Sequence, residues 1–155
     1  MKEQIIETWH INNRVNFMLI DAISDEGLHC TLSKRGGGTA AKQFAHLHNV
    51  RLFRLEHSGK DLLKGQTKIA AKGNIDRTLL KERLGESADA VARIIELAIQ
   101  DGGKVKGFKR GVIPLLGYMI SHEAHHRGNI LLNLKLCGHK IPKEIQYGIW
   151  AWNQI

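Results

Sequence analysis

Three histidines fall within five residues of one apolar segment: His122, His125 and His126. If this segment is helical, His122 and His126 lie one above the other on the same face, because a helix turns by about 100° per residue. Two imidazoles stacked in this way can bind one divalent metal ion. The alternative is that they make ordinary hydrogen bonds, although burial among apolar neighbours would then require a partner for each ring nitrogen.

A third ligand could come from His46 or His48, which lie in a second segment of helical periodicity. Being two residues apart, these side chains point about 160° away from each other on a helix, so at most one can face the bundle centre alongside His122 and His126. Periodicity leaves the choice open, because both sides of this segment carry apolar residues. Three His ligands would leave coordination positions open, which distinguishes catalytic from structural metal sites.

The same residues also fit H-E-x-x-H, the zinc-peptidase pattern, in which Glu123 would be the general base. The extended form of that pattern is excluded, because it needs Gly and His where this chain has Asn129 and Leu132. Glu144 is a conceivable downstream ligand, although the Gly and Pro between it and the histidines indicate a separate turn. A zinc peptidase therefore stays an alternative.

Composition indicates a soluble globular protein with a single domain spanning residues 1–155. The net charge of +8 raises the question of nucleic acid, but the basic residues are scattered and no recognition-helix or zinc-finger pattern occurs. Nucleic acid is therefore not an expected partner. One local cluster stands out in a Gly-containing connector: Lys104, Lys106, Lys109 and Arg110.

The chain contains no apolar run near the roughly 20 residues of a membrane span, and its first residues do not resemble a signal peptide. Its two cysteines do not form a disulfide framework. We therefore expect a cytoplasmic protein that does not associate with a membrane.

Apolar residues at helical spacing predict four long helices, over about residues 2–22, 40–57, 75–100 and 111–137. Thr39 is a suitable N-cap for the second, Pro114 fits the first turn of the fourth, and Gly138 suits its C-terminal end. Convincing strands are absent, so the expected fold is an all-α four-helix bundle with a long connection between the second and third helices. The tail from residue 144, with Trp150 and Trp152, is expected to pack on the bundle end.

Several segments in order resemble the DinB/YfiT-like family. The histidine segment 122–129 resembles that family's H-x-x-H-H-R-G-Q/N stretch, and residues 137–142 resemble the G-x-x-x-P that follows it. Residues 43–51 resemble the family's first metal-ligand segment, and residues 147–150 resemble its ending. The resemblance covers essentially the whole chain. It implies a four-helix bundle of unusual helix order and, in many members, a homodimer.

The resemblance also implies one divalent ion, zinc or nickel most often, bound by His46, His122 and His126. His125 would then support the site without binding the ion, and Arg127 and Asn129 would support the helix or a neighbour. Some relatives resemble thiol-dependent S-transferases and others metal-dependent hydrolases, so the expected nucleophile is a low-molecular-weight thiol or a water molecule activated by the ion. The family name records induction by DNA damage, so a non-catalytic metal-binding or small-molecule-binding protein of the stress response is the other alternative.

Overall fold

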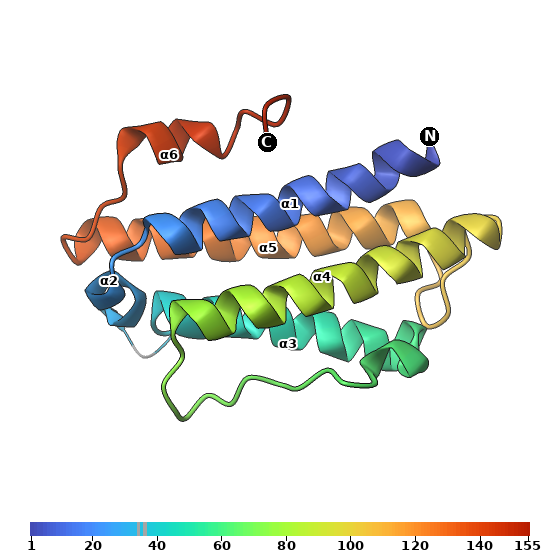
Figure 1. The fold of residues 1–155 in the computed structure, drawn as a ribbon, viewed down its shortest axis with the longest axis horizontal. Helices are drawn as coiled ribbons and strands as arrows, with labels where there is room; N and C mark the ends of the chain where they lie inside the picture. Colours follow the sequence, from blue (N-terminus) through green and yellow to red (C-terminus); the bar gives the residue numbers. More distant parts are fainter. Residues whose placement is uncertain (34, 36) are drawn as a thin grey trace.

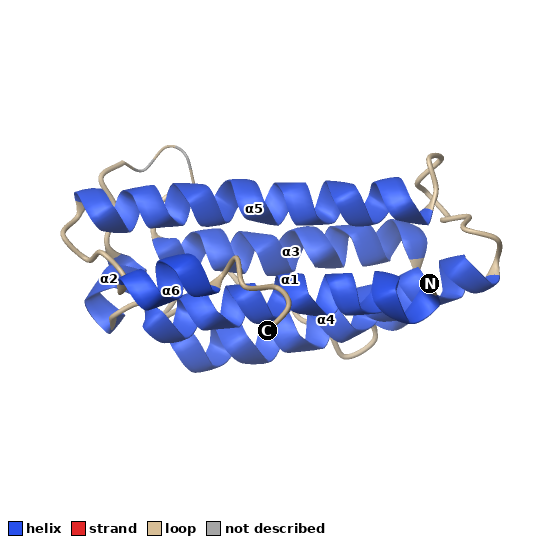
Figure 2. Ribbon diagram, turned by 90° about the horizontal axis from the view of Figure 1, so that it is seen from above, coloured by secondary structure: helices blue, strands red, loops and turns tan. Residues whose placement is uncertain are grey.

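The computed structural model describes residues 1–33, 35 and 37–155, and its helices are shown in Figures 1 and 2. The four long helices are α1 (Lys2–Ala22), α3 (Ala40–Ser58), α4 (Arg77–Gln100) and α5 (Val112–Leu136). Within the described residues no strand forms, and β pairing is limited to the isolated bridge between Val105 and Phe108. The prediction of an all-α bundle with four long helices is therefore confirmed.

The ends of the long helices follow their capping residues. The Thr39 hydroxyl accepts a hydrogen bond from the Lys42 amide, as expected for the N-cap of α3. The third long helix begins at Arg77 and not near residue 75, because Asp76 caps it by accepting from the Leu79 amide. Gly138 follows the last residues of α5 with a φ of 81°, a left-handed conformation that ends helices and favours glycine.

Three short helical segments were not predicted: α2 (Asp25–His29), the 3₁₀ segment η1 (Lys60–Leu63) and α6 (Lys143–Gly148). At four to six residues each, they are too short to show a helical repeat in the sequence. The position of the tail was also wrong. Instead of packing on the bundle end, α6 lies along the side of α1 (Figure 1). It approaches α1 so closely that a Cβ on Gly148 would lie 3.3 Å from the methyl carbon of Met18. Trp150 remains exposed.

The helices run in pairs, with α1 parallel to α5 and α3 parallel to α4 (Figure 1). Because α3 and α4 point the same way, the chain must travel back along the bundle between them. Residues 64–76, here called the connector, make this return beside α3 (Figure 1). The long connection between the second and third long helices is therefore as predicted.

The core consists of apolar side chains from all four long helices in two clusters, one toward each end of the bundle. Trp9 is fully buried in one of them, and its indole N–H donates to the Ala88 carbonyl oxygen over 2.8 Å. In α3, the buried Arg51 lies between Leu47 of one cluster and Leu52 of the other. The middle layer of the bundle is therefore polar.

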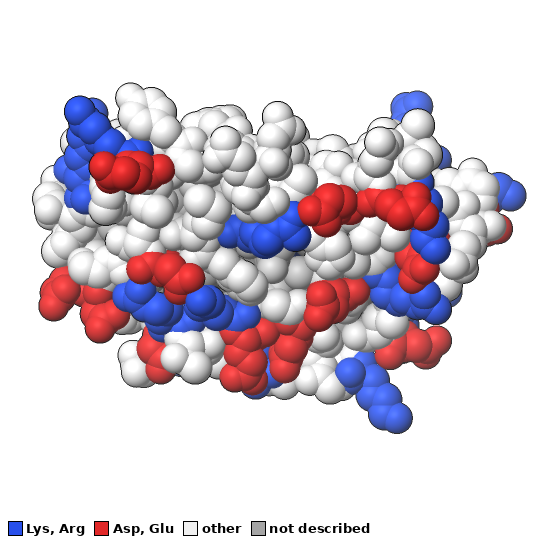
Figure 3. Space-filling view, turned by 45° about the horizontal axis from the view of Figure 1, so that its top comes forward, with Lys and Arg blue, Asp and Glu red and all other residues white. Residues whose placement is uncertain are grey.

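The surface carries both signs of charge. On the face in Figure 3, Lys and Arg side chains are interspersed with Asp and Glu side chains and do not form a continuous basic stripe. Of the described helices, none combines the length and the apolar character needed to cross a bilayer.

Candidate metal centre

The predicted trio of histidines comes together between two neighbouring helices. His46 extends from α3, and His122 and His126 extend from α5, with one possible ligand atom of each lying within 4.8 Å of the others. The ring centroids are 5.3 Å apart for His46 and His122, and 4.8 Å apart for His46 and His126. Tetrahedral nitrogen ligands around one zinc ion lie roughly 3.4 Å apart. Small side-chain movements would therefore bring these rings to ligand spacing.

His48 does not join this group, because it lies on a different side of α3. Its ring is fully buried, and its Nε2 donates to the Thr67 carbonyl oxygen in the connector over 2.9 Å. His46, by contrast, is exposed, as is Phe53 on its side of the helix. The expectation that the ligands face the bundle centre was wrong, because the trio lies at the exposed edge of the α3–α5 interface.

Gln43 holds the ring of His126 from α3. The side chain of Gln43 is almost fully buried, and its amide oxygen lies 3.2 Å from His126 Nδ1. Since an amide oxygen can only accept, His126 Nδ1 carries the proton and Nε2 is left free for a ligand. Gly37 makes room for this arrangement: with φ at 99°, a Cβ there would lie 2.8 Å from Gln43 Cγ. Gln43 was not predicted as a site residue, although its position about one helical turn before His46 was a signal.

The protonation of the rings suits metal binding. Burial, reinforced by the neighbouring His46, lowers the pKa of His122, and burial together with His122 and His46 lowers the pKa of His126 to about 4. Both imidazoles are therefore neutral near pH 7, which is the state that a metal ion requires. In addition, His122 Nδ1 is buried with no hydrogen-bond partner in the described part of the chain. A three-imidazole donor set with an unsatisfied buried nitrogen fits a divalent ion.

Glu123 faces the bundle interior, away from the trio. Arg51 binds it through two hydrogen bonds, from Nε to Oε1 at 2.7 Å and from Nη2 to Oε2 at 2.9 Å. Asn12 and Asn16 of α1 donate to the same Oε2, and Arg127 in turn donates to both asparagine oxygens. Burial alone would raise the pKa of Glu123, but the charge and hydrogen bonds of Arg51 lower it, so the carboxylate stays ionised.

This network argues against the zinc-peptidase alternative, in which Glu123 would be the general base. A general base must reach a water molecule at the ion, whereas Glu123 is buried and both of its oxygens already accept hydrogen bonds. Glu144, the conceivable downstream ligand, is an exposed residue of α6 and does not join the histidines. His125 also stays outside the trio, exposed and in contact with Asn129 through its Nε2 at 3.1 Å.

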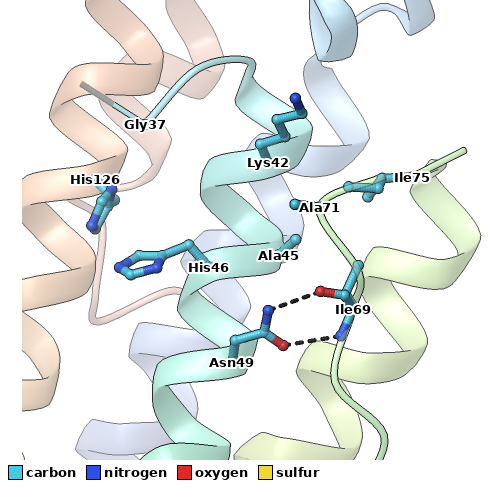
Figure 4. Close-up of a pocket in the computed structure, with 9 residues that line it drawn as sticks. All are labelled: Gly37, Lys42, Ala45, His46, Asn49, Ile69, Ala71, Ile75 and His126. Carbon is cyan, nitrogen blue, oxygen red and sulfur yellow. Dashed lines mark hydrogen bonds between the residues drawn. The ribbon is translucent and has the colours of Figure 1, made fainter. Parts of the chain in front are cut away.

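A cavity of about 470 Å³ opens beside His46 and His126 (Figure 4). One wall is α3 and the other is the connector, which Asn49 fixes by two hydrogen bonds to the backbone of Ile69 at 2.9 and 3.0 Å. The volume is within the range of small-molecule sites. Among the described residues the lining is mostly apolar, and Lys42 is the one Lys, Arg, Asp or Glu side chain in it. Besides His46 and His126, the lining consists of Gly37, Lys42, Ala45, Asn49, Ile69, Ala71 and Ile75.

Four long helices with three convergent imidazoles at the α3–α5 edge define an all-α protein with a candidate divalent-metal site. The model of the DinB family matches residues 1–151, nearly the whole chain. The chain therefore belongs to the DinB family. No curated protein and no solved structure matched it.

Proposed function

We propose that this protein is a divalent-metal-dependent enzyme whose ion is bound by His46, His122 and His126. The observation that carries the proposal is the meeting of these three side chains, two of them neutral imidazoles by their pKa, at an exposed edge that adjoins a small-molecule cavity. Three protein ligands leave open positions at the ion, as in catalytic sites. Zinc or nickel is the proposed ion, since imidazole suits both.

An ion in this site would supply a Lewis acid able to activate a low-molecular-weight thiol or a water molecule, as in S-transferases or hydrolases. The chain's own residues do the positioning. Gln43 selects the free nitrogen of His126, and the Arg51–Glu123 pair fixes α5 against α3. The cavity beside His46 would exclude water around one reactant, and its volume favours a small molecule over a polymer. The homodimer implied by the family resemblance stays a prediction, which sedimentation equilibrium would check.

The first experiment is elemental analysis of untagged protein purified without chelators or a nickel column. We expect about one equivalent of metal in the parent protein. His122→Ala should lose it while keeping its helical circular dichroism. His125→Ala is the matched control, since it removes a neighbouring imidazole outside the trio, and it should keep the metal. Full metal occupancy in His122→Ala, or no uptake of zinc or nickel by the parent, would refute the proposal.

Turnover separates an enzyme from a non-catalytic metal-binding protein. The metal-loaded protein would be assayed with thiol and electrophile pairs and with hydrolysable esters and amides. Activity that disappears in His122→Ala supports the enzyme. Stoichiometric metal without turnover of either substrate class supports the binding protein instead.

A further inference from the structure

Arg54 lies near the trio, two turns beyond His46 on α3, in a frame of three aromatic rings. Its guanidinium carbon is 5.3 Å from the ring centre of Tyr118, 5.4 Å from that of Phe108 and 5.8 Å from that of Phe53. The Tyr118 ring in turn stacks on His122, with centroids 6.2 Å apart and planes inclined by 21°. One aromatic ring therefore separates the Arg54 cation from the candidate metal site.

This cation has no anionic partner among the described residues. Arg51, Arg77 and Arg93 each pair with a carboxylate, whereas Arg54 forms no ion pair, and its buried Nε has no hydrogen-bond partner. The aromatic faces attract the positive charge but do not accept the in-plane N–H groups of a guanidinium. The buried Nε is covered from a ligand, but the two Nη groups make no hydrogen bond within the described part of the chain and are not buried in this way. The group that satisfies them best is an oxyanion, which a guanidinium binds through two parallel hydrogen bonds.

The surrounding charge also favours an anion. Phe108 belongs to the segment 101–111 between α4 and α5, which carries the cluster Lys104, Lys106, Lys109 and Arg110 and only one acidic residue, Asp101. A local excess of positive charge raises the concentration of small anions near it. The basic cluster singled out in the sequence thus lies in the segment that supplies one wall of the Arg54 frame.

We infer that Arg54, framed by Phe53, Phe108 and Tyr118, binds the carboxylate or phosphate group of a small-molecule reactant. The inference that an anion binds here is argued from Arg54 and its surroundings and does not require a metal ion. The further inference that the same molecule reaches the ion with its other end rests on the proposed function. Phe53 and Tyr118 are partly exposed and give the carbon skeleton of such a reactant an apolar surface between the two points.

The test is a titration of the metal-free and zinc-loaded protein with inorganic phosphate and, separately, with succinate, at constant ionic strength. The readout is the set of backbone ¹H–¹⁵N signals around residues 54, 108 and 118, which the parent and every variant retain. We expect a saturable shift in both metal states, and binding at least tenfold weaker in Arg54→Gln. Arg54→Lys keeps the charge but loses the two-pronged geometry, so it should also bind more weakly. Arg93→Gln is the matched control, since it makes the same change of charge on α4 and should bind like the parent.

Each outcome decides one question. Unchanged affinity in Arg54→Gln, or equal losses in Arg54→Gln and Arg93→Gln, would overturn the inference. If phosphate binds more tightly than succinate, the reactant is a phosphorylated molecule. If succinate binds more tightly, the reactant carries a carboxylate. Anion binding that persists in His122→Ala separates this site from the metal centre, so a protein that binds the anions but no metal would refute only the proposed function.

Discussion

The hydrogen bond between His126 and Gln43 decides which nitrogen of the ring is free. Without Gln43, both tautomers and several ring orientations become accessible, so metal binding would have to select one of them. We expect Gln43→Ala to lower zinc affinity by about 10- to 100-fold, the usual effect of losing such a partner. Gln43→Glu keeps an acceptor at the same place and should bind zinc at least as tightly as the parent. Competition with a chromophoric chelator measures both, and equal affinities for parent and Gln43→Ala would contradict the role.

The depressed pKa values of the histidines make stability depend on pH. The pKa of His126 falls from 6.5 to about 4, and those of His48 and His122 are also lowered, in each case first by burial. Between about pH 6.5 and 4 the unfolded chain therefore binds more protons than the folded one. Stability of the metal-free protein should fall as the pH falls through this window.

Urea unfolding of the metal-free protein at several pH values between 7 and 4 would check this. His126→Gln removes the histidine whose pKa is lowered to about 4 and should give a shallower dependence on pH. Parallel curves for parent and variant would show that His126 titrates normally in the folded chain.

At this scale helical spacing predicted the pair on α5 and left the third histidine open between His46 and His48, whereas the family resemblance implied His46. His46 and His48 could not be separated by periodicity, because α3 packs on the core with one side and meets the connector and α5 with others. The roles of Gln43 and Arg54 depend on what faces them across an interface, on His126 in one case and on Phe108 and Tyr118 in the other. Such pairings are not encoded in a local pattern.

Among the helices, the Arg51–Glu123 pair joins α3 to α5, and Asn12 and Asn16 extend the connection to α1. We expect Glu123→Gln to cost about 3–5 kcal/mol of unfolding free energy, because it leaves Arg51 buried without a counter-charge. Replacing both partners by apolar residues, as in Arg51→Met with Glu123→Leu, should cost less than the two single changes together. The cycle consists of the parent, Arg51→Met, Glu123→Leu and the double variant, each unfolded in urea. If the losses of unfolding free energy in the two single variants add up to the loss in the double variant, the pair does not act as a unit.

The connector depends on α3 for its position. Asn49 makes two hydrogen bonds to Ile69, and His48 makes one to Thr67. Removing the Asn49 pair should cost about 1–3 kcal/mol, and it should expose the connector to cleavage by releasing it from α3. Limited proteolysis with mass spectrometry would detect faster cutting within residues 64–76 in Asn49→Ala. The exposed Asn74, replaced by Ala, serves as the control, and equal cutting rates would contradict the anchoring role.

The elements themselves were predictable in proportion to their length. The four long helices carry enough turns for their apolar repeat and caps to be recognised, and their ends were found to within two residues. The five residues of α2 and the six of α6 carry no such repeat. The place of α6 along α1 depends on the close approach of residues that are remote in sequence, such as Gly148 and Met18.

For the molecule as a whole, a bound ion would link α3 to α5 and so oppose unfolding. A ligand at 100 times its dissociation constant stabilises the folded state by about 2.7 kcal/mol. We therefore expect added zinc to raise the melting temperature of the metal-free parent and of His125→Ala, but not that of His122→Ala. Differential scanning calorimetry gives the shift, and an equal shift in His122→Ala would place the stabilising ion elsewhere.

The parallel course of α3 and α4 obliges the chain to include a long return segment, and this segment also forms one wall of the cavity. Loop closure costs little more free energy as a loop lengthens, so such a segment can change in length and sequence at small cost to folding. The helices that hold the histidines and the segment that contacts a reactant can therefore change in sequence independently of each other. Transplanting residues 68–75 between relatives should change which molecules are accepted while the imidazoles stay in place.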